Sequence, residues 1–226
     1  MTVPPLLALE TSTEVCSAAL HVNGEIRQCL ELAGQSHSQR LIPMVDALLA
    51  EAGLTVSSLG GIAVAVGPGS FTGLRIATAV GQGMALGAGL PVAAVGTLDA
   101  MAWADGAEAV LVCVDARMGE FYLGAYHRSG QDIGAVLGPM VVGPDALPDL
   151  PDGRWSGVGN GFALQADLLE RRWPDRLTRR NPQARPEARD VLSLAMVCHP
   201  DGFTDPPESL VPLYVRDKVA LTMAER

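Results

Sequence analysis

Two acidic residues, each at the end of an apolar run, are the first candidates for chemistry in this sequence. Glu10 follows the apolar residues 6–9, and Asp115 follows residues 109–114. If the two runs are strands of neighbouring sheets, their carboxylates can face each other across a cleft and hold Mg²⁺ or act as a general base. The alternative is a strand-end or helix-capping role without chemistry.

Hydroxyl and glycine residues near these acids are suited to phosphate. Thr11, Ser12 and Thr13 follow Glu10 directly, and residues 67–73 (GPGSFTG) join an apolar run to a helical pattern. Free N–H groups at the start of a helix attract anions. The turn is not a Walker A loop, because Leu and Arg follow it where Lys and Ser or Thr are required. We therefore predict at most weak ATP or ADP binding, with a tight structural turn as the alternative, at Glu10, Thr11, Ser12, Thr13, Gly67, Gly69, Ser70 and Asp115.

Histidine and cysteine residues form no recognisable metal motif. The sequence has no HExxH or HxxxH, and no two of its four cysteines have C-x2-C spacing, so we predict no bound metal. Cys16 and Cys29 flank a predicted hairpin as diagonal neighbours, about 7–8 Å apart at Cα. That separation is too long for an easy disulfide, and we expect reduced thiols in a cytosolic protein.

Apolar patterning predicts that an α/β layer fold positions these residues. In the first half we expect strands at 6–10, 15–22 and 25–32, a helix at about 38–52, a strand at 62–66, a helix at 74–88 and a strand at 92–95. Asn23-Gly24 fits the type I′ turn of a hairpin. The second half, after a loop near 103–108, is expected to repeat this outline, which predicts two related halves. Its strands are predicted at 109–114, 121–126, 136–142 and 155–158, its helices at 143–145, 162–172 and 191–197, and exposed connections at 174–189 and 200–209.

The helical segment at residues 74–88 is unusually rich in small residues. They recur four apart in two series, Gly73, Ala77, Gly81, Ala85 and Gly89, and Ala79, Gly83 and Gly87. Such ridges allow close approach of another element. Each internal glycine costs up to roughly 1 kcal/mol relative to alanine, so packing must offset that cost. The packing partner is either the chain's own sheet or another subunit.

Composition and charge exclude several classes of protein. The chain has 226 residues, of which 48% are hydrophobic, so it is not a disordered protein. A net charge of −9 argues against non-specific nucleic-acid binding. Residues 76–98 carry no charge, but Gly89-Leu90-Pro91 interrupts them, so we predict no membrane span. Seven arginines lie in residues 171–189, where they can contact tRNA or an acidic partner or form a solvated helix end and loop.

Several motifs, in order along the chain, resemble those of the TsaB (YeaZ) family. They are LALETST at 7–13, His37-Ser38-Gln39 with Leu41-Ile42-Pro43, GPGSFTGLR at 67–75 with Gln82-Gly83, VDARMGE at 114–120 with Tyr122, and Pro212, Tyr214, Arg216, Val219 and Ala220. The similarity spans nearly the whole chain. One position departs from the family pattern: the first-strand acid is Glu10 rather than Asp, and its longer side chain can fill a phosphate or metal site.

The resemblance implies an actin/Hsp70/sugar-kinase-like (ASKHA) fold of two related α/β domains with mixed sheets covered by helices. We expect an N-terminal domain at residues 1–104 that carries the dimerisation helices, and a smaller C-terminal domain at 105–226 whose last segment can pack back on the first. The implied role is that of a cytoplasmic, non-catalytic subunit required for N6-threonylcarbamoyladenosine (t6A) formation at position 37 of ANN-decoding tRNAs. The implied partners are a TsaD-like catalytic subunit, a TsaE-like ATPase, a second copy of the chain and, through the complex, tRNA; neither cofactor nor membrane is implied.

In that family two helices form the partner interface, and here they correspond to residues 38–52 and 72–88. The expected interface residues are Leu41, Val45, Leu48, Leu74, Ala77, Thr78, Gly81, Gln82 and Ala85. On this placement, Gly81→Arg blocks association without unfolding the chain. Two other functions stay open: an independent ATP-binding phosphotransferase or ATPase of the same fold, and a metalloprotease, suggested only by the older glycoprotease (M22) naming of the superfamily.

Overall fold

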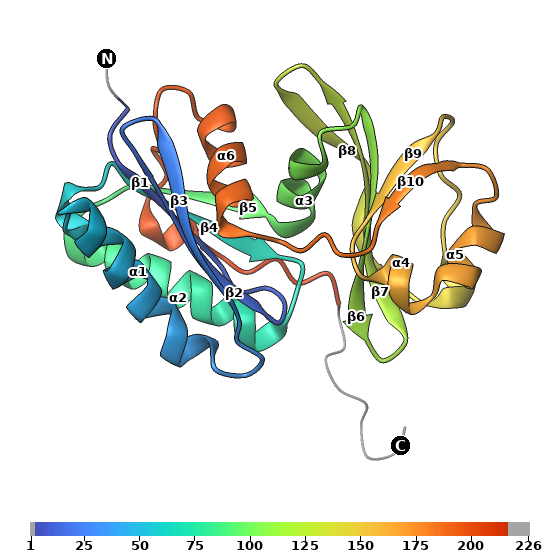
Figure 1. Ribbon diagram of the computed structural model, residues 1–226, viewed down its shortest axis with the longest axis horizontal. Coiled ribbons are helices and arrows are strands. Elements are labelled where there is room, and N and C mark those ends of the chain that lie inside the picture. Colours follow the sequence, from blue (N-terminus) through green and yellow to red (C-terminus); the bar gives the residue numbers. More distant parts are fainter. Residues whose placement is uncertain (1–2, 217–226) are drawn as a thin grey trace.

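The protein contains two five-stranded sheets of the same topology. A computed structural model describes residues 3–216 of the chain (Figure 1). The first sheet has the order β3-β2-β1-β4-β5, with β1 (Leu6–Glu10), β2 (Val15–Val22), β3 (Glu25–Leu32), β4 (Gly61–Gly67) and β5 (Val92–Gly96). The second has the order β8-β7-β6-β9-β10, with β6 (Ala109–Arg117), β7 (Glu120–Ser129), β8 (Asp132–Val142), β9 (Trp155–Val158) and β10 (Leu177–Asn181).

The strand directions also match between the two sheets. In each sheet the first three strands in sequence are antiparallel and the fourth and fifth run parallel to the first. The predicted α/β fold of two related halves is therefore confirmed. The first hairpin also has its predicted register, because Cys16 lies opposite Glu31 and Cys29 opposite Ala18. The four cysteines are free thiols.

Helices cover both faces of the first sheet. Helices α1 (His37–Ala52) and α2 (Phe71–Ala88) pack on one face around Leu7, Leu9 and Val64. Helix α6 (Ala188–Cys198) packs on the other face, although it follows the second sheet in sequence (Figure 1). We call the first sheet with α1, α2 and α6 the first lobe. The second lobe is the second sheet with α4 (Gly161–Leu164) and α5 (Ala166–Arg172).

One helix between the two sheets was not predicted. Helix α3 (Thr97–Asp105) occupies part of the expected loop at 103–108 and contacts elements of both sheets. Leu98, Ala100, Met101 and Ala102 are buried in it. Because neighbours surround several of its sides, α3 lacks the one-sided apolar stripe that marks a surface helix.

Other element bounds also differ from the predictions. Helix α2 begins at Phe71 rather than Leu74, and α1 begins six residues before Pro43 and continues through it. The helix predicted at 162–172 is divided at Gln165 into α4 and α5. Strand β10 lies within the predicted connection 174–189, and 3-10 helices at Val56–Ser58 and Pro207–Ser209 were not predicted. The short helix predicted at 143–145 is a 3-10 helix at Pro144–Ala146. Among residues 3–216, no helix is long and apolar enough to cross a membrane.

Candidate functional site

A cavity of about 580 Å³ lies between the lobes. Its first-lobe wall comes from the β1–β2 turn, at Ser12 and Thr13, and from the start of α2. Its second-lobe wall comes from the end of β6 and from Tyr122, and residues 213–216 close a third side. Tyr122 donates its hydroxyl proton to the Gly69 carbonyl at 3.0 Å, which fixes the spacing of the lobes at this point.

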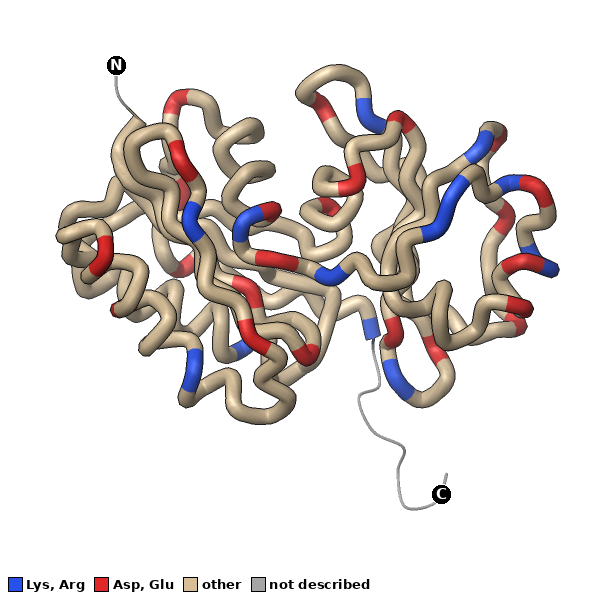
Figure 2. The backbone as a smooth tube through the Cα atoms, in the orientation of Figure 1, with Lys and Arg blue, Asp and Glu red and all other residues tan. Residues whose placement is uncertain are grey.

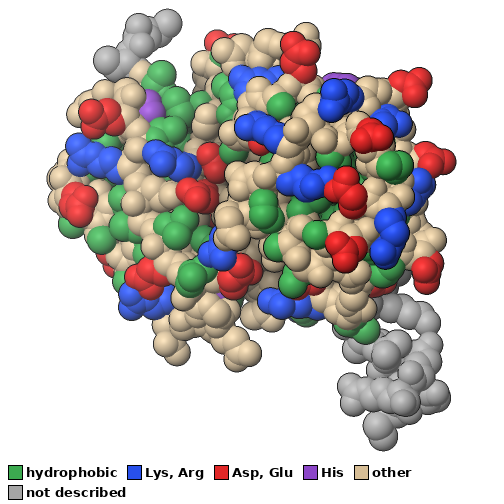
Figure 3. Space-filling view, turned by 45° about the vertical axis from the view of Figure 1, so that its right-hand side comes forward, with side chains coloured by type: hydrophobic (Ala, Val, Ile, Leu, Met, Phe, Trp, Pro, Cys, Tyr) green, Lys and Arg blue, Asp and Glu red, His purple; other side chains and the backbone are tan. Residues whose placement is uncertain are grey.

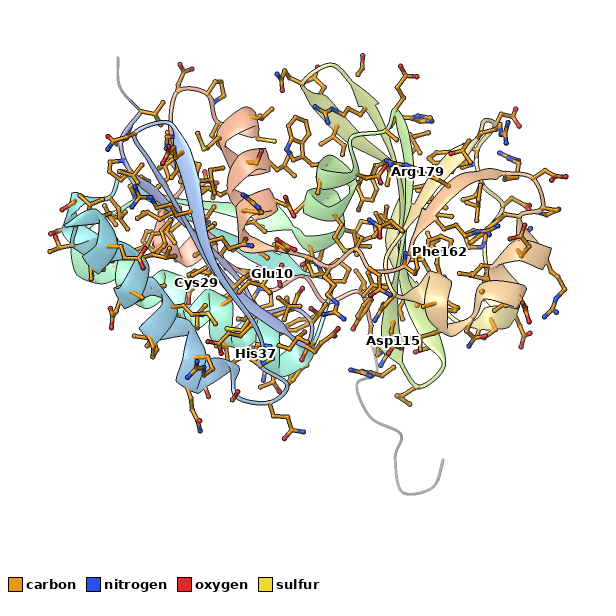
Figure 4. The ribbon with its side chains drawn as sticks, in the orientation of Figure 1. Glu10, Cys29, His37, Asp115, Phe162 and Arg179 are labelled. Atoms are coloured by element: carbon orange, nitrogen blue, oxygen red, sulfur yellow. The ribbon has the colours of Figure 1, made fainter. Side chains whose placement is uncertain are left out.

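Glu10 does not reach this cavity. Its side chain lies at the end of β1 and is fully buried (Figure 4). One carboxylate oxygen accepts the Ser12 N–H, and the other has no hydrogen-bond partner among residues 3–216. Burial without a cation raises the pKa of Glu10 to about 7. The prediction that Glu10 and Asp115 face each other across a cleft is therefore wrong for Glu10, whose carboxylate caps its own turn.

Asp115 lies on the second-lobe wall of the cavity, but its hydrogen-bonding groups are already engaged. Its N–H donates to Asn160 Oδ1 at 2.8 Å, and its carboxylate accepts the Arg117 N–H at 2.8 Å. The Arg117 guanidinium lies 3.2 Å from the other carboxylate oxygen. Asp115 is also not at the end of its strand, because β6 continues to Arg117 with a register shift between the two residues.

The glycine-rich turn packs directly on the hydroxyl-rich turn. The Ser70 N–H donates to the Ser12 carbonyl at 2.6 Å, and the Thr11 hydroxyl donates to the Gly73 carbonyl at 2.7 Å. A Cβ atom at Gly69 would lie 2.5 Å from the Ser12 carbonyl oxygen, so only glycine fits there. Several polar groups of the two turns that were predicted to bind phosphate thus form hydrogen bonds with one another instead.

Some polar groups of the predicted site remain available to the cavity. Ser12, Thr13, Gly69, Ser70 and Asp115 line it, and within the described part of the chain the buried Ser12 hydroxyl has no hydrogen-bond partner. Neither Glu10 nor Thr11 lines it, and Gly67 sits behind it under the Leu213 carbonyl. In the described part of the chain, no three His, Cys, Asp or Glu side chains lie together as metal ligands would.

The residues predicted for the partner interface lie mostly in the core of the first lobe. Eight are buried in the chain itself, namely Leu41, Val45, Leu48, Leu74, Ala77, Thr78, Gly81 and Ala85. Gln82 is half-buried and donates to the Leu210 carbonyl at 2.9 Å. A Cβ atom at Gly81 would lie 2.6 Å from Val64 Cγ2, so Gly81→Arg would disrupt the fold. This first ridge packs on the chain's own sheet, and the expectation that Gly81→Arg leaves the chain folded is corrected.

The second small-residue ridge of α2 faces outward. Ala79, Gly83 and Gly87 are exposed, and no atom lies within 4 Å of the place where a Cβ would stand at Gly83 or Gly87. Apolar side chains are also exposed on the two helices: Ile42 is 45% and Leu86 is 66% exposed. The exposed surface of α1 and α2 is therefore made of the outward neighbours of the predicted residues.

The arginines of the window 171–189 are mostly engaged within the chain, some inside the second lobe and others with α3 or the first lobe. Arg172 pairs with Asp149, Arg179 with Asp105, Arg180 with Glu170 and Arg185 with Glu14, while Arg176 donates to the carbonyls of Pro151 and Gly153. Five of the seven arginines thus have partners within the chain. Figure 2 shows acidic residues close to the basic ones along this segment, and Figure 3 shows both signs mixed over the second lobe. The window is not a continuous cationic surface of the kind that phosphate backbones require.

The sequence analysis expected only that the last segment packs back on the first domain, and it did not place residues 213–216 in the cavity wall. Arg75 donates to the Tyr214 hydroxyl at 2.9 Å and stacks on the Phe71 ring at 3.6 Å. Arg216 reaches Glu120 in the second lobe. Pro212, Tyr214 and Arg216 belong to the quoted family pattern and could have indicated this segment; Val219 and Ala220 lie outside the described residues.

Comparisons with known proteins agree on one family. The family model described as TsaD, tRNA N6-adenosine threonylcarbamoyltransferase, matches residues 31–222. The chain is similar to the tRNA threonylcarbamoyladenosine biosynthesis protein TsaB of Escherichia coli K12, with 38% identity over 95% of this chain and 96% of that protein. It is also similar to the protein of the same name from Haemophilus influenzae, with 37% identity over 95% and 94% of the two chains.

A solved structure has the same fold throughout. YeaZ from Pseudomonas aeruginosa superimposes with a TM-score of 0.83 and 37% identity, covering 94% of this chain and 100% of that one. The correspondence therefore includes both lobes.

Proposed function

The chain belongs to the TsaB family of tRNA threonylcarbamoyladenosine biosynthesis proteins, and from this premise we propose that it is a non-catalytic subunit of t6A formation. It binds and supports a TsaD-like catalytic subunit that modifies position 37 of ANN-decoding tRNAs. A TsaE-like ATPase joins the pair, and tRNA meets the chain through the complex. The chain acts in the cytoplasm and needs no cofactor of its own.

The observation that carries the non-catalytic role is the mutual packing of the two turns at the cavity. The Ser70 N–H donates to the Ser12 carbonyl, and the Glu10 carboxylate accepts the Ser12 N–H. A phosphate at the start of α2 would have to displace the first of these contacts. The Glu10 carboxylate, which the sequence offered as a general base, is sealed from the cavity. These features favour a supporting role for the fold over phosphoryl transfer.

We place the partner surface on the outward faces of α1 and α2. Ala79, Gly83 and Gly87 form a smooth ridge, and small residues allow the backbones of two helices to approach closely. Ile42 and Leu86 add apolar area on both sides of this ridge. A second copy of the chain can use the same surface when the TsaD-like subunit is absent.

A calorimetric titration with the TsaD-like protein of the same organism tests this placement. We expect one-to-one binding, and Gly83→Arg lowers its affinity at least about thirtyfold, which corresponds to roughly 2 kcal/mol. Gly134→Arg is the matched control, because this glycine is equally exposed but lies on β8. Equal affinities for the two variants would move the interface away from α2, and no binding by the wild-type chain would remove the subunit role.

One feature favours a second candidate, an independent ATP-binding phosphotransferase or ATPase. Ser12, Ser70 and Asp115 line a cavity large enough for a nucleotide, and the Ser12 hydroxyl has no protein partner there. On this alternative the isolated chain turns over Mg-ATP, and Asp115→Asn abolishes that turnover. Absence of turnover by the purified chain eliminates it.

A further inference from the structure

The last described segment, residues 210–216, crosses from one lobe to the other. In Figure 1 this segment continues from the 3-10 helix at Pro207–Ser209 and ends between the lobes. Residues 213–216 line the cavity between the lobes. The segment has no helical or strand structure of its own, so side-chain and single backbone contacts must hold it in place.

The first lobe holds this segment at three points. Leu210 is buried in the core beneath α2, and its carbonyl accepts a proton from Gln82 at 2.9 Å. The Leu213 N–H donates to the Val66 carbonyl at 2.7 Å. These two contacts run along the inner side of α2 to the carboxyl end of β4.

An aromatic and cationic cluster at the first turn of α2 makes the third attachment. The Arg75 guanidinium lies over the Phe71 ring at 3.6 Å and donates to the Tyr214 hydroxyl at 2.9 Å. The Phe71 and Tyr214 rings lie 5.5 Å apart. The cluster ties Tyr214 to the first turn of α2.

The second lobe holds the segment through Arg216. Its guanidinium donates to the Ala116 carbonyl at 2.9 Å and to Glu120 Oε2 at 2.5 Å. Both acceptors belong to the β6–β7 hairpin, which forms the opposite wall of the cavity. The Arg216 side chain is only 16% exposed, so solvent screens this ion pair less than an ordinary surface pair.

We propose that residues 210–216 are a strap that joins the two lobes and controls access to the cavity between them. Three attachments fix the strap to the first lobe, whereas Arg216 is its polar attachment to the second. Breaking the Arg216 contacts therefore frees the β6–β7 hairpin from the strap without removing the strap from α2. The strap joins the lobes of the isolated chain whether or not a partner binds α2.

The test measures access to the cavity with a thiol placed inside it. Val114→Cys puts a small side chain on the buried second-lobe wall, in a background where Cys29 and Cys198 are changed to Ser. Cys16 and Cys113 stay in place, because both are buried and burial raises the pKa of each thiol, which slows its reaction. The rate at which the introduced thiol reacts with a disulfide reagent then reports opening of the cavity.

Arg216→Gln is expected to raise that rate about tenfold, the factor for the loss of one hydrogen bond to a charged group. Arg117→Gln is the matched control: it removes the same charge from the same cavity, but Arg117 pairs with Asp115 inside the second lobe. The control should leave the rate unchanged within about twofold. Equal rates for both variants would overturn the proposal.

A second variant keeps the proposal falsifiable if Arg216→Gln folds poorly. Glu120→Ala removes the acceptor from the other side of the contact and should also accelerate the reaction. The double variant should react no faster than Arg216→Gln alone, because the arginine change already breaks the contact with Glu120. Additive effects would show that Arg216 packs locally and holds no strap.

Discussion

The buried carboxyl group of Glu10 should make the protein less stable as pH rises. Its pKa is about 7 in the folded protein and 4.5 for an ordinary glutamate, because burial disfavours the charged form. Between these values the folded state binds more protons than the unfolded state, so the free energy of unfolding falls with pH. The stabilising contribution is complete below pH 4.5 and is lost above pH 7. One pKa unit corresponds to about 1.4 kcal/mol, so the loss amounts to roughly 3 kcal/mol.

The assay compares Glu10→Gln with the wild-type chain by urea denaturation from about pH 4.5 to about pH 8. The glutamine keeps an oxygen to accept the Ser12 N–H and cannot ionise. The difference in unfolding free energy between the two proteins should therefore change by roughly 3 kcal/mol in favour of the variant as pH rises. Burial also raises the pKa of Asp190 to about 7, so Asp190 provides the control. In an Asp190→Asn background, Glu10→Gln should change the pH dependence of the unfolding free energy by the same amount as in the wild-type chain. A pH-independent difference between Glu10→Gln and wild type would refute the reasoning.

Two further pairs of variants test packing. Gly83→Ala should stabilise the protein by about 0.5–1 kcal/mol, because the added methyl group meets open space and alanine has the higher helix propensity. Gly81→Ala should destabilise the protein by about 1–3 kcal/mol through overpacking. Thermal unfolding of both variants measures this contrast, and a stabilising Gly81→Ala would contradict it. Arg179→Gln should lower the free energy of unfolding by about 1–3 kcal/mol, because it leaves the buried Asp105 carboxylate without its cation. Arg171 is exposed on α5, and the unfolding free energy of Arg171→Gln should stay within about 0.5 kcal/mol of wild type. Urea denaturation distinguishes these, and equal effects of the two arginine variants would contradict the structural role of Arg179.

The sequence predicted the strands of both sheets well wherever one rule dominated. Asn23-Gly24 forced the first hairpin into a two-residue turn, and the register then followed by counting. Strand β10 was missed because its residues, LTRRN, are almost all exposed at a sheet edge and show no apolar alternation. Helix α3 was missed for the opposite reason, since it is apolar on several sides. Periodicity identifies elements with one buried face, and it misses elements that are exposed throughout or buried on several sides.

The candidate site shows a different limit of sequence reasoning. The apolar stripes of α1 and α2 were interpreted as an interface, but a stripe of Leu41, Val45 and Leu48 at helical spacing is what a helix presents to its own core. The exposed ridge at Ala79 and Gly83 could be recognised only after the burial of its neighbours was known. The inward position of the Glu10 carboxylate likewise involves a hydrogen bond from the backbone N–H of Ser12, and no spacing rule predicts that bond.

Helix α2 joins the features that the proposals use separately. Its first ridge packs on the sheet at Gly81 and its second ridge is open at Gly83. Arg75 and Gln82, two turns apart along the helix, both hold the strap. A protein that covers the outward face of α2 therefore lies beside the Arg75 and Tyr214 cluster. If the partner binds the strapped form more tightly, then by thermodynamic linkage the strap must favour the partner to the same extent. The same helix can in this way transmit partner binding to the cavity between the lobes without any catalytic group of its own.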